Sequence, residues 1–248
     1  MKSHMYLFYT EASTLQDNAG GEKMELNKFS EHIWYMPFEE ERDRPNLGYV
    51  KGDKYSLAID AGHSAAHVEE FYSLLHKENL PLPEITVLTH WHWDHTFGMH
   101  AVNGLCVSNE RTNKHLAECK NKIEAGGTEE FFGIHESIRK EYAGTRDVIV
   151  SLADIIYSGE MTFDLGGCRV RIMESQSPHT DDATLVYVSE DKVLFTGESC
   201  GEDFFTGVKD KRLSVKLADM IREINPGICI EGHWIPVDTE NTITELLS

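Results

Sequence analysis

The sequence has little positive charge for its length. Its 248 residues include 23 Lys and Arg against 42 Asp and Glu, which gives a formal net charge of −19 at pH 7. A surface with this excess of negative charge repels a phosphate backbone and anionic lipid headgroups. The composition therefore argues against nucleic acid and membranes as partners, and it leaves a small-molecule substrate as the expected partner.

Long apolar runs, paired cysteines and an export signal are also missing. No stretch of about 18 apolar residues occurs, and the first residues do not form a signal-peptide pattern. The five cysteines include no Cys-x-x-Cys pair, so neither a disulfide framework nor a thiolate zinc site is indicated. The sequence therefore predicts a cytoplasmic protein with reduced thiols.

Three common motifs for catalysis or nucleotide binding are absent as well. We find no Gly-x-Ser-x-Gly nucleophile elbow, no phosphate-binding loop and no dinucleotide-binding glycine pattern. A serine nucleophile or a bound nucleotide is therefore not expected, and the chemistry has to come from other residues.

Short apolar runs alternate with helical patterns along most of the chain, which favours an α/β fold. Residues 64–77, for example, have apolar positions at helical spacing, and Ser64 can cap that helix. Residues 1–23 are expected to form an appendage and residues 24–248 one domain. The polar, glycine-containing segment at about 121–147 is expected to be a helical insertion beside the site that influences substrate choice.

One short string of residues carries most of the chemical signal. His90, His92, Asp94 and His95 fall within six positions directly after an apolar run that predicts a strand. In an extended segment, side chains two residues apart point the same way, so His90 and His92 can bind one ion. Imidazole and carboxylate are ligands for zinc, iron or manganese. The string therefore predicts a metal site with room for a second ion.

Three further ligand candidates stand at the ends of predicted strands. His179 precedes one strand, whereas Glu198 and His233 each follow another. Sites in α/β sheets usually lie at strand ends, so we expect these side chains to join the first cluster.

The whole pattern resembles the metallo-β-lactamase superfamily from about residue 29 to the C-terminus. The first motif of the family is matched by Asp60-Ala61-Gly62. Its later motifs are matched by His90, His92, Asp94, His95, His179 and His233. The resemblance implies a four-layer αβ/βα sandwich with a dinuclear metal site, in which Asp60 orients the metal loop without binding metal.

The resemblance also implies how the ligands divide between two divalent ions. The residues expected at one ion are His90, His92 and His179. The residues expected at the other are Asp94, His95 and His233. Zinc is the favoured metal, with iron or manganese as alternatives, and Asp94 is also the candidate catalytic residue. Two such ions can share a water, lower its pKa towards about 7 and polarise the bond to be cleaved.

Glu198 is where the sequence departs from the family, which normally has a bridging aspartate at this position. Glutamate is one methylene longer, so three arrangements stay open. Glu198 can bridge both metals, bind one of them, or orient a histidine ligand.

Four neighbouring residues complete the candidate site. His63 and His67 are expected at the start and on the exposed face of the helix after Asp60. Phe204 and Phe205, which follow Glu198, are expected either to line the mouth of the site or to belong to the core.

Taken together, these features predict a metal-dependent hydrolase of a small ester-like substrate, such as a lactone, thioester or phosphodiester. Two alternatives remain. One is an iron-dependent oxidoreductase of the same fold, either a thiol dioxygenase or a diiron enzyme, and the other is a non-catalytic metal-binding protein.

Overall fold

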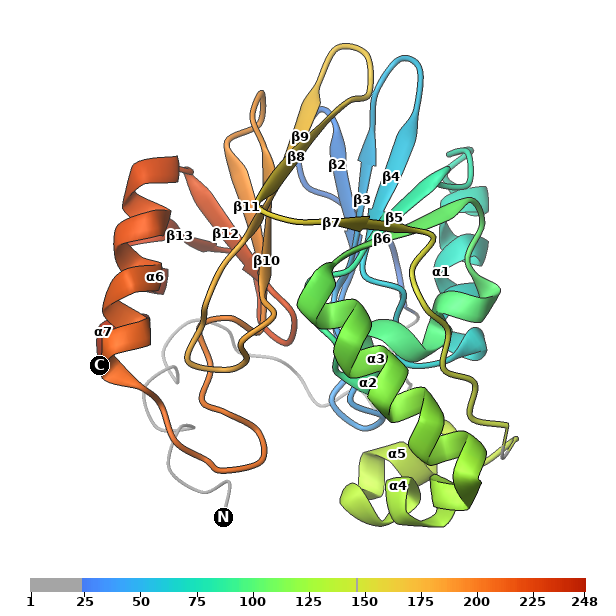
Figure 1. Ribbon diagram of the computed structural model, residues 1–248. Helices are drawn as coiled ribbons and strands as arrows, with labels where there is room; N and C mark the ends of the chain where they lie inside the picture. The colour runs from blue at the N-terminus through green and yellow to red at the C-terminus, as the bar shows by residue number, and fades with distance from the viewer. Residues whose placement is uncertain (1–23, 146) are drawn as a thin grey trace, which may run out of the picture.

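The computed structural model describes residues 24–145 and 147–248. In this part of the chain, the strands form two sheets that face each other between two layers of helices (Figure 1). The predicted α/β four-layer sandwich is therefore confirmed. The expected appendage over residues 1–23 lies outside the described residues.

The two sheets divide the chain near residue 158, because strands β1 to β7 form one sheet and β8 to β13 the other. The strands of the first sheet are β1 (Asn27–Lys28), β2 (Ile33–Met36), β3 (Leu47–Lys51), β4 (Ser56–Ile59), β5 (Ile85–Val87), β6 (Leu105–Asn109) and β7 (Ile155–Tyr157). Those of the second are β8 (Glu160–Asp164), β9 (Arg169–Glu174), β10 (Thr184–Val188), β11 (Val193–Gly197), β12 (Ile228–Glu231) and β13 (Val237–Asp238).

Helices cover the outer faces of both sheets. The helices of the described residues are α1 (Ala65–Lys77), α2 (Trp93–Thr96), α3 (Glu110–Lys122), α4 (Thr128–Ile134), α5 (Glu136–Glu141), α6 (Lys211–Ile224) and α7 (Thr239–Leu247), with a 3₁₀ helix η1 (Phe97–Ala101) and a π-helical turn η2 (Ile123–Gly127). The predicted start of α1 is confirmed, because the Ser64 side chain accepts a hydrogen bond of 3.3 Å from the backbone N–H of His67. Within 121–147, η2, α4 and α5 follow one another and lie together at one end of the molecule (Figure 1).

The core is built in layers. Leu57 of β4 and Val170 of β9 belong to the apolar cluster between the sheets. Phe71 of α1 packs in the cluster outside the first sheet, and Leu217 of α6 in the cluster outside the second. Each sheet is thus buried on both faces, which is why its central strands read as continuous apolar runs.

Strand directions bring the predicted site residues to one edge of the sandwich. Strands β4 to β7 are parallel, so their carboxyl ends share an edge. In the second sheet β11 and β12 are parallel and β10 is antiparallel to β11, so the start of β10 lies beside the ends of β11 and β12. The loops that carry the candidate ligands all leave from these strand ends, where α/β folds place their sites.

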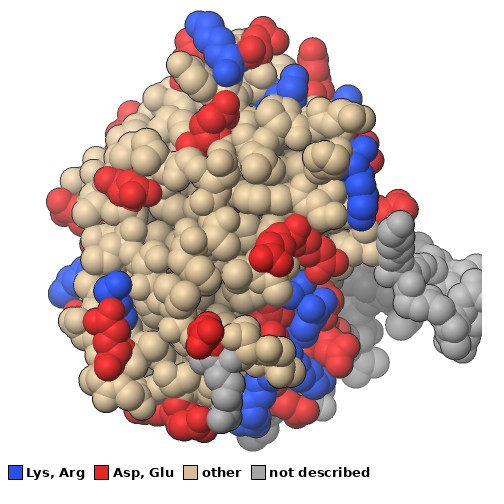
Figure 2. Space-filling view, turned by 90° about the vertical axis from the view of Figure 1, so that its right-hand side faces the viewer, with Lys and Arg blue, Asp and Glu red and all other residues tan. Residues whose placement is uncertain are grey.

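The negative charge of the protein is not concentrated on the face that carries α1. Figure 2 shows this side with a broad central area that has few charged side chains, while acidic and basic groups alternate towards the edges. Among the helices of residues 24–145 and 147–248, none has the length and apolar character needed to cross a membrane.

Candidate metal centre

The loop between β5 and α2 presents four candidate ligands from a short, buried segment. His90 and His92 precede α2, and Asp94 and His95 lie in its first turn. All four side chains are buried. The Thr96 hydroxyl donates hydrogen bonds to the carbonyl oxygens of residues 91 and 92, at 3.1 and 2.9 Å, and these bonds close the loop. The Thr96 side chain therefore restrains the backbone of the ligand string.

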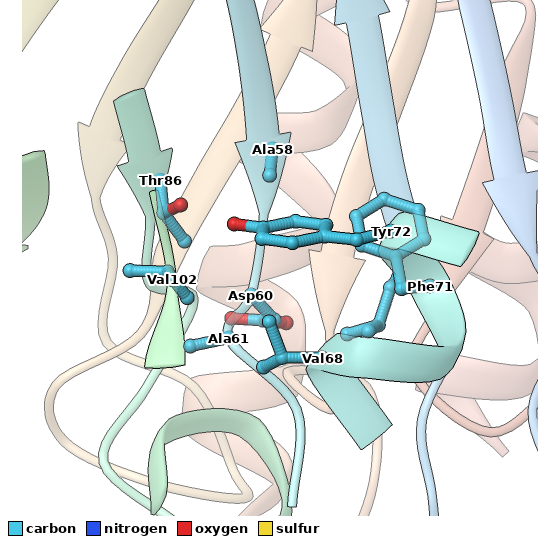
Figure 3. Close-up of a pocket in the computed structure, with 9 residues that line it drawn as sticks. Ala58, Asp60, Ala61, Val68, Phe71, Tyr72, Thr86 and Val102 are labelled. Carbon is cyan, nitrogen blue, oxygen red and sulfur yellow. The ribbon is translucent and has the colours of Figure 1, made fainter. Parts of the chain in front are cut away.

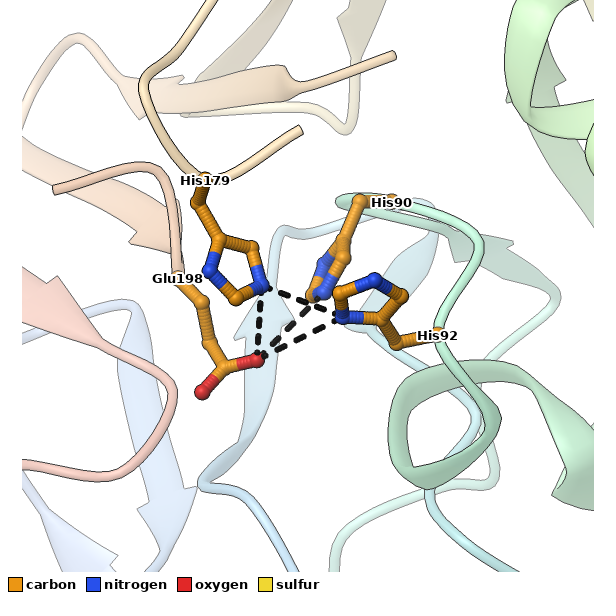
Figure 4. A group of neighbouring side chains, drawn as sticks. All are labelled: His90, His92, His179 and Glu198. Atoms are coloured by element: carbon orange, nitrogen blue, oxygen red, sulfur yellow. Dashed lines mark hydrogen bonds and ion pairs between the residues drawn. The ribbon is translucent and has the colours of Figure 1, made fainter. Parts of the chain in front are cut away.

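The structure brings all seven predicted ligand residues together in two overlapping groups. In each group, one ligand atom from every member lies within 4.8 Å of the others. The first group is His90, His92, His179 and Glu198 (Figure 4). The second group is Asp94, His95, Glu198 and His233. This division is the one that the resemblance implied.

Glu198 belongs to both groups and lies between them. Its Oε2 is 3.5 Å from His90 Nε2 and 3.1 Å from His179 Nε2, and Figure 4 shows these contacts converging on one carboxylate oxygen. The same oxygen is 3.8 Å from His95 Nε2, and Oε1 is 3.7 Å from His233 Nε2. A carboxylate in this position can serve either group or both.

The histidine rings are oriented by acceptors on their far sides. His95 Nδ1 lies 2.7 Å from Asp60 Oδ2, and His179 Nδ1 donates to the carbonyl oxygen of Glu202 at 2.6 Å. A proton held at Nδ1 leaves the Nε2 lone pair free to face the site. Among the described residues, Asp60 lies outside both groups.

Asp60 instead supports the ligand loop. Its carboxylate accepts hydrogen bonds from the Thr89 backbone N–H at 2.7 Å and from the Thr89 hydroxyl at 2.9 Å. Its φ of 66° is in the left-handed region, which aspartate enters more readily than most residues. Asp60 therefore turns the chain after β4 and fixes both the loop and His95, as the resemblance implied.

The residues present fit a pair of divalent cations. The Nε2 atoms of His90 and His95 are buried and have no hydrogen-bond partner in the described part of the chain. Buried polar atoms are almost always paired, because leaving one unpaired costs roughly 1–3 kcal/mol. Imidazole nitrogens and carboxylate oxygens that converge in this way are the donor set expected for zinc and similar ions.

The protonation states of His90 and the two carboxyls suit the same purpose, whereas burial alone would lower the pKa of His95, His179 and His233 but neighbouring carboxylates outweigh it and raise the pKa of all three rings. Burial lowers the pKa of His90 well below its usual value, so this ring is neutral at pH 7. Burial alone would raise the pKa of Asp94 and Glu198, but the neighbouring histidines outweigh it and hold the pKa of both carboxyls well below the usual range. Both are therefore carboxylates, the form that binds a metal.

Two glycines that the sequence analysis did not single out allow the close packing. A Cβ at Gly232 would lie 2.9 Å from His95 Cε1 and 3.3 Å from Glu198 Cγ, which is too near for a side chain. Gly197 has a φ of +55°, and a Cβ there would lie 2.6 Å from the Thr89 hydroxyl oxygen. Each glycine directly precedes a candidate ligand in the sequence, and this position could have indicated its role in close packing.

The expectation of an exposed face for His67 is wrong, because its side chain is fully buried, as is that of His63 just before the start of α1. His63 Nδ1 donates to the carbonyl oxygen of Arg42 at 3.0 Å, and His67 Nδ1 accepts from the His63 backbone N–H at 3.2 Å. The loop that carries Arg42 folds over the start of α1 and covers this face. Helical spacing alone could not show that a distant loop would do so.

Phe204 and Phe205 lie beside the site rather than in the core. Their ring centroids are 6.1 and 5.8 Å from that of His92, and the side chains are 36% and 57% exposed. Of the two positions that the sequence left open, the mouth of the site is therefore the correct one.

A small crevice beside Asp60 is not part of this centre. It lies between α1 and strands β4 and β5, has no room for a water molecule, and its lining is mostly apolar, as with Val68 and Phe71 (Figure 3). None of the seven candidate ligands lines it, so it offers no reaction site.

A buried ion pair attaches the 121–147 segment to the scaffold. Arg44 donates to both carboxylate oxygens of Glu141 in α5, at 2.7 and 2.8 Å, and the Ser64 hydroxyl also donates to Glu141. Nearby, the Tyr142 hydroxyl donates to the carbonyl oxygen of His63 at 2.8 Å. These bonds fix α5 to the loop that follows Asp60.

Replacing Glu141 with glutamine is expected to lower the free energy of unfolding by about 2 kcal/mol at pH 7, because Arg44 would lose its buried carboxylate partner and keep only the part-exposed Glu70, 2.7 Å from its Nη1. Burial would raise the pKa of Glu141, but hydrogen bonds from Arg44 and Ser64 hold it below its usual value. The carboxylate therefore stabilises the fold above its unfolded-state pKa, and this contribution disappears as the pH falls through the lowered pKa.

Urea denaturation between pH 3 and 7 measures this difference. The gap between wild type and Glu141→Gln should be largest at neutral pH and should shrink in acid, whereas Glu69→Gln at an exposed position of α1 should match wild type throughout. A pH-independent gap would show that the charge on Glu141 is not what stabilises the fold.

Comparison with known families identifies the chain. The family model of the metallo-beta-lactamase superfamily matches residues 42–202. The protein therefore belongs to the metallo-beta-lactamase superfamily, as the motif pattern suggested. Curated proteins give no significant match.

Solved structures with the same fold support this assignment. A metallo-beta-lactamase from Pontibacter korlensis has a TM-score of 0.66 and 19% identity, covering 90% of this chain and 99% of the other. A metallo-beta-lactamase family protein from Thermus thermophilus has a TM-score of 0.61 and 17% identity, covering 87% and 78%. The stereoselective inverting sec-alkylsulfatase Pisa1 from Pseudomonas sp. has 0.66 and 14%, covering 90% of this chain and 40% of the other. At these identities the likeness is one of fold.

Proposed function

We propose that the protein is a cytoplasmic, metal-dependent hydrolase that cleaves a small ester-like substrate at a centre of two divalent metal ions, zinc being the favoured metal. The observation that carries the proposal is the position of Glu198, whose carboxylate belongs to both ligand groups. A single carboxylate shared by two groups of converging donors suits a pair of ions that act on one water.

Each residue has a defined part in this proposal. His90, His92 and His179 would hold one ion, Asp94, His95 and His233 would hold the other, and Glu198 would be shared by both. Two divalent ions bound there would supply hydroxide at neutral pH and polarise the carbonyl or phosphoryl oxygen. Asp94 is proposed to act in catalysis too. Its ionised Oδ2 lies 3.0 Å from His233 Nε2 and can accept a hydrogen bond from the reacting water.

A small molecule is the proposed substrate rather than a nucleic acid. The net charge of −19 repels polyanions. The test is a panel of lactone, thioester, β-lactam and phosphodiester substrates, assayed with zinc-, manganese- and iron-loaded protein. Hydrolysis that depends on an added divalent metal supports the proposal. Iron content with oxygen uptake and no hydrolysis would instead support the oxidoreductase alternative.

Removal of the metals should leave the protein folded but less stable. The apolar clusters between and outside the sheets do not include the metal ligands, so the core forms without the ions. A ligand that binds only the native state at 100 times its Kd adds about 2.7 kcal/mol, so chelation should lower the Tm by several degrees. Circular dichroism before and after EDTA measures both effects. Loss of the folded spectrum at room temperature would contradict this expectation.

The 121–147 segment is proposed to influence substrate choice. Its Phe131 packs against Trp93 with ring centroids 6.0 Å apart, and Trp93 in turn lies against His92. Replacing Phe131 with alanine should therefore alter the ratio of kcat/KM values across the panel. Equal losses of kcat/KM for every substrate would show that the segment has only a structural role.

A further inference from the structure

Exposed apolar side chains gather on the two loops that leave the metal centre. Phe204, Phe205 and Val208 follow Glu198 and are 36%, 57% and 60% exposed. Trp234 and Ile235 follow His233 and are 38% and 64% exposed. Large apolar side chains left in water lose the stabilisation that burial would give, and such patches commonly mark binding sites.

The loop after Glu198 forms a turn that is fixed by hydrogen bonds. Asp203 Oδ1 accepts hydrogen bonds from the backbone N–H groups of Phe205 at 3.1 Å and Thr206 at 2.7 Å. The carbonyl oxygen of the preceding residue, Glu202, accepts the 2.6 Å bond from His179 Nδ1. The two phenylalanines are therefore held in a loop that also orients a metal ligand.

The loop after His233 is fixed in a similar way. The side-chain amide of Asn46 donates to the carbonyl oxygen of Glu231 at 2.6 Å and to that of Trp234 at 2.7 Å. Both apolar loops are thus positioned before any substrate arrives, which reduces the entropy lost on binding.

The rings reach the metal centre itself. Phe204 and Phe205 both contact the His92 ring, at centroid distances of 6.1 and 5.8 Å. The ring of Trp91 is stacked on Phe205, with centroids 5.9 Å apart and planes inclined by 9°. A substrate group bound next to His92 would therefore lie against an aromatic surface.

Basic side chains are almost absent from the loops that carry the ligands. Segments 88–97, 175–183, 198–210 and 232–236 contain Lys209 and no other Lys or Arg. Lys209 Nζ donates to the carbonyl oxygen of Glu245 at 2.9 Å. In the neighbouring loop, Arg42 is paired with Glu39 and Arg44 with Glu141. A carboxylate, sulfate or phosphate on the substrate would find no unengaged basic residue on these described loops.

We propose that the loops after Glu198 and His233 bind the apolar arm of a neutral ester or lactone, so that the substrate class is an uncharged acyl ester with an alkyl or aryl acyl group. This rests on the proposed hydrolase function. In the reaction, the acyl carbon–oxygen bond breaks, and water supplies its hydroxyl to the acyl carbon and its proton to the leaving alkoxide. The carboxylate product is then repelled by Asp181, Glu202 and Asp203 on the loops that carry His179 and Glu198, which favours release.

The first experiment measures kcat and KM for p-nitrophenyl esters of acetic, butyric and hexanoic acid, with a succinate half-ester as the anionic match for butyrate. Each methylene that is buried should improve kcat/KM by about three-fold. Phe205→Ala should raise KM about ten-fold more for the hexanoate than for the acetate, and Phe205→Leu should restore most of the preference. Val215→Ala on α6, which is 49% exposed and outside the site, is the matched control.

The second experiment measures binding without turnover, through the tryptophan fluorescence of metal-free protein titrated with methyl ketones of increasing chain length. Affinity should rise with chain length in wild type and in Val215→Ala, and this rise should be lost in Phe205→Ala. Hydrolysis of all esters with equal efficiency, or better use of the succinate, would overturn the inference and leave the hydrolase function intact. No hydrolysis of any ester, lactone, thioester, β-lactam or phosphodiester would overturn the hydrolase function, while flat ketone binding would overturn the apolar site by itself.

Discussion

Replacing His179 or His90 with alanine is expected to reduce hydrolysis by more than about 100-fold and to lower the metal content of the purified protein. Loss of a residue that only supports a ligand already costs roughly 10- to 100-fold in metal affinity or activity, so loss of a ligand should cost more. His179 Nε2 lies 3.1 Å from Glu198 Oε2 and 3.1 Å from His92 Nδ1, so its removal opens the first group of donors. Steady-state kinetics and elemental analysis measure the two effects.

A matched histidine elsewhere is the control for this experiment. His76 stands in the last turn of α1 and is exposed, so His76→Ala should keep wild-type metal content and activity. Full activity and full metal occupancy in both His90→Ala and His179→Ala would show that neither residue is a metal ligand.

Glutamine in place of Glu198 should cause the second large effect, with loss of one metal and a decrease in activity of about 100-fold. The change keeps the length of the side chain but removes the negative charge that compensates two dications. Aspartate should retain more of both, because it keeps the charge and gives up only one methylene. The backbone here is constrained, since Gly197 approaches Thr89 closely and the Glu198 carbonyl oxygen accepts from the Gly201 N–H at 2.9 Å.

Metal stoichiometry separates the possible roles of Glu198. If aspartate loses the metal held by Asp94, His95 and His233 first, then the longer side chain is needed to reach the second group. An unaltered metal content in Glu198→Gln would show that Glu198 is not a ligand, and the bridge would then need another donor.

The fold and the grouping of the candidate ligands were largely predictable because their signals are local or regular. The string from His90 to His95 comes directly after an apolar run that indicated a strand. The alternation of strand and helix patterns indicated the α/β layers. His179 and His233 could be placed because parallel and antiparallel strands bring their ends to a common edge.

Contacts between distant segments could not be predicted in the same way. The buried His63 side chain donates a hydrogen bond to the carbonyl oxygen of Arg42, and the ion pair of Arg44 with Glu141 joins residues 97 positions apart. No periodicity or motif encodes such a contact. The placement of Phe204 and Phe205 at the mouth of the site likewise depends on a turn built by Asp203, whose side chain has no pattern that predicts its partners.

The central claim is that this chain holds two metal ions on one shared carboxylate. The most direct test is to remove metal with EDTA, reconstitute the protein with zinc and determine zinc per chain by elemental mass spectrometry. The two donor groups predict about two zinc ions in wild type and about one in each of His90→Ala and His233→Ala. About one ion per chain or fewer in wild type, or about two in both variants, would contradict the claim.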